Sequence, residues 1–103
     1  MKKTQAIWTA EAIGDLEIIY DFLAIHSSVA AQRICENILG RSRQIEAFPD
    51  SGSLHISLKD SNKNFRYLVE GNYKIIYSHQ VNPEVIYIHA VFDARLNPEK
   101  LKM

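Results

Sequence analysis

Residues 65–93 read FRYLVEGNYKIIYSHQVNPEVIYIHAVFD, and this stretch decides the fold. Three runs rich in β-branched and aromatic residues are separated by two groups of turn-forming residues. That pattern is typical of antiparallel strands joined by tight connections. We therefore predict strands at 65–69, 73–79 and 85–92, with turns at Glu70-Gly71-Asn72 and Val81-Asn82-Pro83-Glu84.

Side chains alternate between the two faces of a strand, so each predicted strand has two sets. In the last strand one set is uniformly apolar and is expected to meet the rest of the core: Ile86, Ile88, Ala90 and Phe92. The other set is mixed: Val85, Tyr87, His89 and Val91. Arg66 and Lys74 lie on neighbouring strands, and each is able to project to the mixed face.

The first half of the chain changes to a helical period. After a short strand at 5–8, Thr9 is able to cap a helix with an apolar stripe at Ile13, Leu16, Tyr20 and Leu23, widened by Ile19 and Phe22. His26-Ser27-Ser28 ends the pattern, and either serine is able to cap a second helix. A second helix follows through Ala31, Ile34, Ile38 and Ile45 towards Phe48, and Pro49-Asp50-Ser51-Gly52 ends it. Such a short loop allows only an antiparallel pair.

These elements predict one α+β domain over residues 1–103, in the order β-α-α-β-β-β, or with one further strand. The further strand is an edge strand at 54–58. We expect a mainly antiparallel sheet with the helical hairpin on one face. Its core should join the apolar face of the last strand to both helices, through Leu16, Tyr20, Leu23, Ile34 and Ile38.

Composition excludes several classes of protein. The hydrophobic fraction is 47% and twelve basic residues balance twelve acidic ones, so strong phosphate binding through a basic surface is not indicated. No apolar run approaches the roughly 18 residues of a membrane helix, and none of signal-peptide length follows Met1–Gln5. Cys35, the single cysteine, is expected to be a buried, reduced thiol, which favours a cytoplasmic location.

The first helix is acidic throughout, with Glu11, Asp15, Glu17 and Asp21 and no basic residue. The sequence leaves two interpretations open. The helix either has an ordinary solvated face, or it presents a docking face for a basic partner.

Motifs for metal, cofactor or nucleophilic chemistry are absent from the sequence. The four histidines, His26, His55, His79 and His89, lie far apart and lack the spacing of metal ligands. There is no glycine-rich phosphate loop, and there is no GxSxG, HExxH or CxxC motif. We predict neither a metal site nor a cofactor.

The three strands, with Asp93-Ala94-Arg95-Leu96-Asn97-Pro98 after the last of them, carry a family resemblance. Trp8-Thr9-Ala10-Glu11-Ala12 and Phe48-Pro49-Asp50-Ser51-Gly52 at the ends of the helices complete it. Together they resemble the RelE/ParE toxins of bacterial type II toxin–antitoxin modules, from about Ile7 to Pro98. The resemblance implies a last strand beside the first, and a cognate antitoxin that wraps the toxin.

Activity divides within this family. RelE-like members cleave messenger RNA on the ribosome, whereas ParE-like members inhibit DNA gyrase. Arg66 and Arg95 match arginines of the family, and both are suited to bind phosphate. Cleaving members usually carry a Tyr or His near the C-terminus as general acid, and no such residue follows Arg95 here. Only His89 or Tyr87 is left to replace it.

The resemblance therefore favours a ParE-like toxin that inhibits gyrase by binding. The candidate target-binding residues are Arg66, Arg95, Lys74 and Asp93. Two alternatives remain open: a ribosome-dependent endoribonuclease using Arg66, Arg95, His89 and Tyr87, and a degenerate toxin that serves only as a protein-binding module. The arginines also have structural interpretations, in which Arg66 pairs with Glu70 or Asp93, and Arg95 forms a local ion pair with Asp93.

Overall fold

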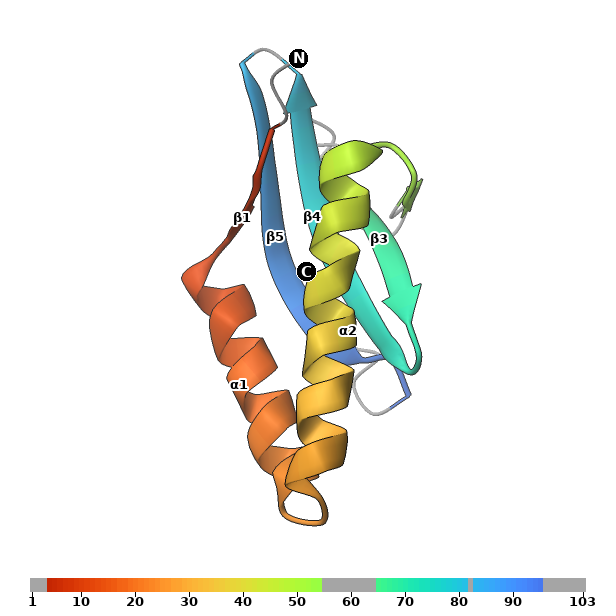
Figure 1. The fold of residues 1–103 in the computed structure, drawn as a ribbon. Helices are drawn as coiled ribbons and strands as arrows, with labels where there is room; N and C mark the ends of the chain where they lie inside the picture. The colour runs from red at the N-terminus through yellow and green to blue at the C-terminus, as the bar shows by residue number, and fades with distance from the viewer. Residues whose placement is uncertain (1–3, 55–64, 82, 96–103) are drawn as a thin grey trace.

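The computed structural model describes residues 4–54, 65–81 and 83–95. Along the chain the elements are β1 (Ala6–Trp8), α1 (Ala10–Ala24), α2 (Ser28–Ala47), β2 (Ser53–Leu54), β3 (Phe65–Glu70), β4 (Tyr73–Val81) and β5 (Glu84–Asp93). The strands form one sheet in the order β1-β5-β4-β3-β2, and the helices lie side by side on one face of it (Figure 1). The predicted α+β architecture is confirmed.

The strand neighbours also agree with expectation. Strand β5 pairs in parallel with β1, so the last strand does lie beside the first. The pairs β4–β5, β3–β4 and β2–β3 are antiparallel. The β4–β5 ladder is longer than predicted, because it continues to a pair between Val81 and Glu84. Of the predicted edge strand at 54–58 only Leu54 lies within the described residues, and it belongs to β2.

Both helices begin at the predicted capping residues. The Thr9 hydroxyl accepts a hydrogen bond from the Ala12 N–H at 3.1 Å and donates one to the Ile88 carbonyl at 3.0 Å, so the cap also ties α1 to β5. At the start of α2 the Ser27 hydroxyl accepts from the Ala30 N–H at 3.1 Å. Within the described part of the chain, no helix is long and apolar enough to cross a membrane.

The apolar stripe of α1 differs from the prediction. The positions that pack into the core are Ala12, Leu16, Ile19 and Leu23. Ile13, Tyr20 and Phe22 are 46%, 37% and 59% exposed, so their assignment to the stripe is wrong. The rotation of α1 is fixed by two polar contacts with β5: the Thr9 cap, and a hydrogen bond of 3.0 Å from the Val91 N–H to the Asp15 carboxylate. Fully buried Ala12, which has almost no side chain, permits this close approach.

The face assignment of β5 is correct for its first half only. The ladder pairs Tyr77 with Ile88 and Ile76 with Ala90, so His89 is an extra residue that forms a β-bulge. Because an extra residue shifts the alternation by one, the faces exchange after it. Val91 therefore joins Ile86 and Ile88 on the helix side, whereas Ala90 and Phe92 lie on the opposite face.

Two apolar clusters result, one on each face of the sheet. The larger lies between the sheet and the helices and contains Ile38, Ile45, Ile75, Tyr77 and Ile88 among its members. The smaller consists of Ile76, Ala90 and Phe92, with Phe65, Tyr67 and Ala94 packed against them. Cys35 is buried as a free thiol in the larger cluster, as predicted, and burial raises its pKa.

Replacing Ile88 with Ala tests the layer assignment, because Ile88 is fully buried on the helix face. We expect the free energy of unfolding to fall by about 2–5 kcal/mol. Ile25→Ala removes the same atoms from a residue that is 75% exposed, and should cost at most about 0.5 kcal/mol. Urea denaturation of the two variants checks this, and equal midpoints would contradict the assignment.

Candidate functional site

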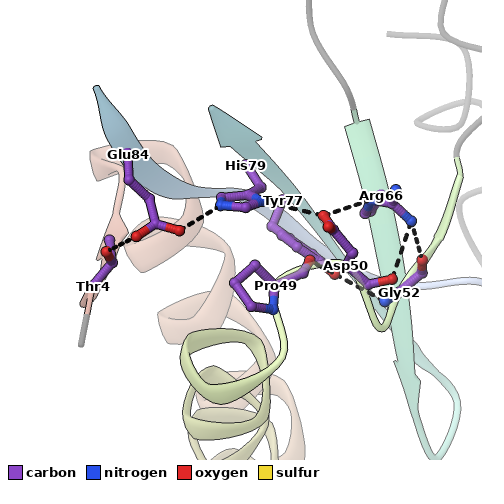
Figure 2. A network of polar contacts seen from close by, with 8 residues as sticks. All are labelled: Thr4, Pro49, Asp50, Gly52, Arg66, Tyr77, His79 and Glu84. Carbon is purple, nitrogen blue, oxygen red and sulfur yellow. Dashed lines mark hydrogen bonds and ion pairs between the residues drawn. The ribbon is translucent and has the colours of Figure 1, made fainter. Parts of the chain in front are cut away.

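A row of polar contacts joins the end of α2 to the sheet at the Pro49–Gly52 turn (Figure 2). Its anchor is Tyr77 on β4, which is fully buried. The Tyr77 hydroxyl donates to the Pro49 carbonyl at 2.6 Å and accepts from the Gly52 N–H at 2.9 Å. Burial raises the pKa of Tyr77 above its ordinary value, which keeps the donating proton in place. One side chain thus satisfies two backbone groups of the turn.

Gly52 is required by the closeness of this approach. A β-carbon at position 52 would lie 2.6 Å from the Tyr77 hydroxyl oxygen and 2.7 Å from the Tyr67 carbonyl oxygen. Both distances are shorter than a carbon atom tolerates, and one of the two oxygens belongs to the backbone. Any other residue would therefore push the turn away from β3 and β4.

Arg66 holds the same turn from β3. Its Nη1 donates to the carbonyl oxygens of Gly52 at 2.8 Å and Asp50 at 3.2 Å, and its Nε lies 3.5 Å from the Asp50 carboxylate. The side chain is only 21% exposed and lies on the helix side of the sheet, not on the predicted second face. Its predicted structural partners were Glu70 and Asp93, but Glu70 pairs instead with Arg41 of α2 at 2.9 Å.

His79 lies between two carboxylates at the next position along the row. Its Nδ1 is 3.1 Å from Asp50 and its Nε2 is 2.8 Å from Glu84, which also accepts a hydrogen bond from the Thr4 hydroxyl. An ionised carboxylate only accepts, so both ring nitrogens must carry protons to make both bonds. Burial lowers the pKa of His79, but the hydrogen bonds and charges of Glu84 and Asp50 outweigh burial and raise it above 6.5.

The second face of the sheet holds a different group of side chains. Tyr87 and His89 lie there, with ring centroids 6.0 Å apart, and Phe65 meets His89 edge-on at 5.2 Å. Ser78, which is 2% exposed, has its hydroxyl 2.7 Å from His89 Nε2. The Lys74 ammonium lies 4.5 Å from the centre of the Tyr67 ring, as a cation–π contact. Lys74, Tyr87 and His89 therefore do share the predicted face.

Arg95 follows the end of β5 and forms a local ion pair. Its Nη2 lies 3.0 Å and its Nε 3.2 Å from the two carboxylate oxygens of Asp93, and its backbone N–H donates to the same group at 2.9 Å. Hydrogen bonds and charge from Asp93 raise the pKa of Arg95. The Arg95 side chain is nevertheless 64% exposed, so it presents its guanidinium to solvent.

The four candidate catalytic residues do not converge. Arg66 pairs with Tyr77 in the ladder and Asp93 pairs with Tyr73, four residues along β4, which separates the two arginines by about 13 Å of strand. Arg66 also points to the helix side, whereas Tyr87 and His89 lie on the other face. What the structure brings together instead is Arg66, Asp50, His79 and Glu84.

Tyr77, Asp50, His79 and Glu84 were not among the predicted site residues. Asp50 and Gly52 were recognised only as turn formers. A partial signal exists: Tyr77 and His79 follow Ile75 at intervals of two on β4, and Arg66 is the ladder partner of Tyr77, so the three polar side chains share the helix face. Among the described residues, no group of three His, Cys, Asp or Glu side chains is arranged to hold a metal ion.

Tyr77→Phe tests the anchor of the turn. Removing the hydroxyl leaves the Gly52 N–H and the Pro49 carbonyl without this partner, and each buried group left unsatisfied costs about 1–3 kcal/mol. We expect a loss of that order in the free energy of unfolding by urea. Tyr20→Phe, at a residue that is 37% exposed, is the matched control and should have little effect. Equal stabilities of the two variants would contradict the role given to Tyr77.

His79→Gln tests the bridging imidazolium. Because the folded pKa of His79 is raised, its contribution to stability is fully present below about pH 6.5 and is lost as pH rises through the folded pKa. The neighbouring carboxylate of Glu84 stays ionised throughout, since its pKa is lowered by hydrogen bonds from Thr4 and His79. The stability difference between wild type and variant should therefore shrink from about pH 6 to about pH 8. A difference that does not change with pH would contradict the bridge.

Comparisons with known proteins agree with this fold. A family model described as "ParE toxin of type II toxin-antitoxin system, parDE" matches residues 6–98. A search of curated proteins gives no match. Among solved structures, a chain from "Chromosomal ParDE TA system from P. aeruginosa" superposes with a TM-score of 0.69 at 16% identity, covering 87% of this chain and 95% of that one. At 16% identity the structural superposition establishes the fold alone. The family is established by the family model, which matches nearly the whole chain. The chain therefore belongs to the ParE toxin family of type II toxin–antitoxin systems.

Proposed function

We propose that this chain inhibits DNA gyrase by direct binding in the cytoplasm, and that a cognate antitoxin neutralises it. Membership of the ParE family supports the proposal. The observation that carries it is that the residues of the ribonuclease alternative, Arg66, Arg95, His89 and Tyr87, do not converge on one site. Arg66 lies on the helix side of the sheet, and Tyr87 and His89 lie on the opposite face.

That separation matters because RNA cleavage by 2′-hydroxyl attack needs several groups at one phosphate. A base takes the 2′ proton, a cation stabilises the phosphate, and an acid protonates the leaving oxygen. Guanidinium groups stay protonated and do not move protons. Arg66 also has its Nη1 donating to two backbone carbonyls of the turn. Inhibition by binding needs none of this convergence.

The proposed target-binding residues divide by exposure. Arg95 presents positive charge at the surface, and Asp93 orients its side chain through two hydrogen bonds. Lys74 is half-buried, with its ammonium over the Tyr67 ring. Arg66 is largely covered, so it contributes by fixing the turn at Pro49–Gly52. Arg95→Ala is consequently a sharper test of target binding than Arg66→Ala, which also loosens the turn.

Antitoxin binding is the second half of the proposal. The solved relative is described as a ParDE toxin–antitoxin system, which supports a protein partner here. We expect a tight complex that buries on the order of 2,000 Å² or more in total. Co-expression with the small protein encoded beside this gene should restore growth and give a complex that purifies intact. A harmless chain that binds no neighbouring product would contradict the toxin assignment.

The activity is tested by comparing a gyrase supercoiling assay with a ribosome-dependent RNA cleavage assay. We expect the purified chain to inhibit supercoiling and to leave messenger RNA intact. Arg95→Ala should weaken inhibition by about tenfold, equal to about 1.4 kcal/mol. Arg33→Ala removes the same charge from an exposed position on α2 and is the matched control. Each variant is first shown to have the wild-type unfolding midpoint.

Two outcomes would overturn the gyrase proposal. Cuts at fixed codon positions that disappear in Arg66→Ala or His89→Ala would establish the ribonuclease alternative. Activity in neither assay, with antitoxin binding retained, would establish a chain that serves only as a binding module.

A further inference from the structure

Four large apolar side chains are exposed towards the connected end of the helical hairpin. Ile18 and Phe22 of α1 are 69% and 59% exposed, and Ile25, the C-cap of α1, is 75% exposed. Val29, at the start of α2, is also 75% exposed. We call these four residues the tip stripe. Ile18, Phe22 and Ile25 recur at intervals of four and three, so they lie on one face of the helix.

The fold does not use the tip stripe. The core face of α1 is Ala12, Leu16, Ile19 and Leu23, and its rotation is fixed by the Thr9 and Asp15 contacts with β5. Ile18 and Phe22 are therefore held away from the larger cluster. Contiguous exposed apolar side chains of this kind mark interaction sites more often than ordinary surface does.

The charges that border the tip stripe on α1 are negative, whereas Arg33 follows Val29 by four residues on α2. Asp21 is three residues after Ile18 and four before Ile25, so it borders both on the helix surface. Glu11 lies seven residues before Ile18, on the same face. Both carboxylates are exposed, and α1 has no lysine or arginine. An apolar stripe with acidic borders is complementary to an apolar stripe with basic borders.

We propose that the tip stripe is a docking site for an amphipathic helix of a partner protein, whose apolar side is flanked by lysine or arginine. Ile18 to Ile25 spans about 10 Å of helix, which suits a partner helix of roughly two to three turns. A second copy of this chain is disfavoured, because a symmetric contact would place the acidic borders of two α1 helices together. The inference rests on the proposed function for one point alone, that the chain works by binding proteins.

The test uses neither gyrase nor toxicity, so its result is independent of the gyrase proposal. Two synthetic helical peptides of about 18 residues share one leucine stripe, flanked by lysine in the first and by glutamate in the second. A third has the composition of the first in scrambled order. Binding to the full chain is measured by calorimetry, and the contact site is mapped by amide chemical-shift changes in ¹⁵N spectra.

We expect the lysine-flanked peptide to bind at least about tenfold more tightly than either control peptide. The shift changes should cluster within residues 11–29. Phe22→Ser should weaken binding by about tenfold or more, while Val81→Ser, at a residue that is 73% exposed on β4, should leave it unchanged. Asp21→Lys should also weaken binding, whereas Glu36→Lys, the same change of charge on exposed α2, should have a smaller effect.

All four substituted residues are exposed, so we expect the variants to keep the wild-type unfolding midpoint. Equal affinity for the lysine and glutamate peptides, or shift changes confined to the sheet, would overturn the proposal. Concentration-dependent dimers in sedimentation that Phe22→Ser abolishes would also overturn it, because the stripe would then be covered by a second copy.

Discussion

The register between β4 and β5 is the constraint on which the rest of the structure depends. From the pair of Val81 with Glu84 to the pair of Tyr77 with Ile88, the side chains of paired residues lie on the same face of the sheet. The extra residue His89 then reverses which side chains of β5 lie on each face. This exchange brings Val91 under the helices, where its N–H donates to Asp15 of α1. It also leaves Ala90 and Phe92 to form the second cluster with Ile76. A single inserted residue therefore determines both apolar layers and contributes to the rotation of α1.

Tyr77 forms the last pair before the bulge, so the register of β4 and β5 also determines where its side chain meets the end of α2. Its hydroxyl holds the Pro49–Gly52 turn, and the turn places Asp50 between Arg66 and His79. The row then continues to Glu84 at the start of β5. Positive and negative groups alternate along it, so each charge is compensated by its neighbours. An arginine compensated in this way binds an additional anion only by weakening contacts that hold the turn, which is why Arg66 is better understood as a structural residue.

Much of this fold was predictable because its signals are local. The strands, the Thr9 and Ser27 caps and the turn at Glu70-Gly71-Asn72 each follow from a few adjacent residues. The bulge was not predictable, because Ile88, Ala90, Val91 and Phe92 are all apolar and fit either face. The rotation of α1 was missed because Ala12 adds little hydrophobicity, although its small size is what allows the helix to approach β5. The polar row joins residues as distant in sequence as Thr4 and Glu84, and only tertiary structure brings them together.

A net charge of zero conceals how unevenly the charges of this protein are distributed. α1 is acidic without a basic residue, the polar row compensates its own charges, and Arg95 stands exposed beside Asp93 at the other end of the sheet. A fold shared by toxins with different targets does not determine the target. We propose that the target depends on the side chains that the fold leaves exposed. The guanidinium oriented by Asp93 and the apolar stripe with acidic borders on α1 are our candidates, because both are better suited to recognising a protein surface than to moving the protons of a phosphate ester.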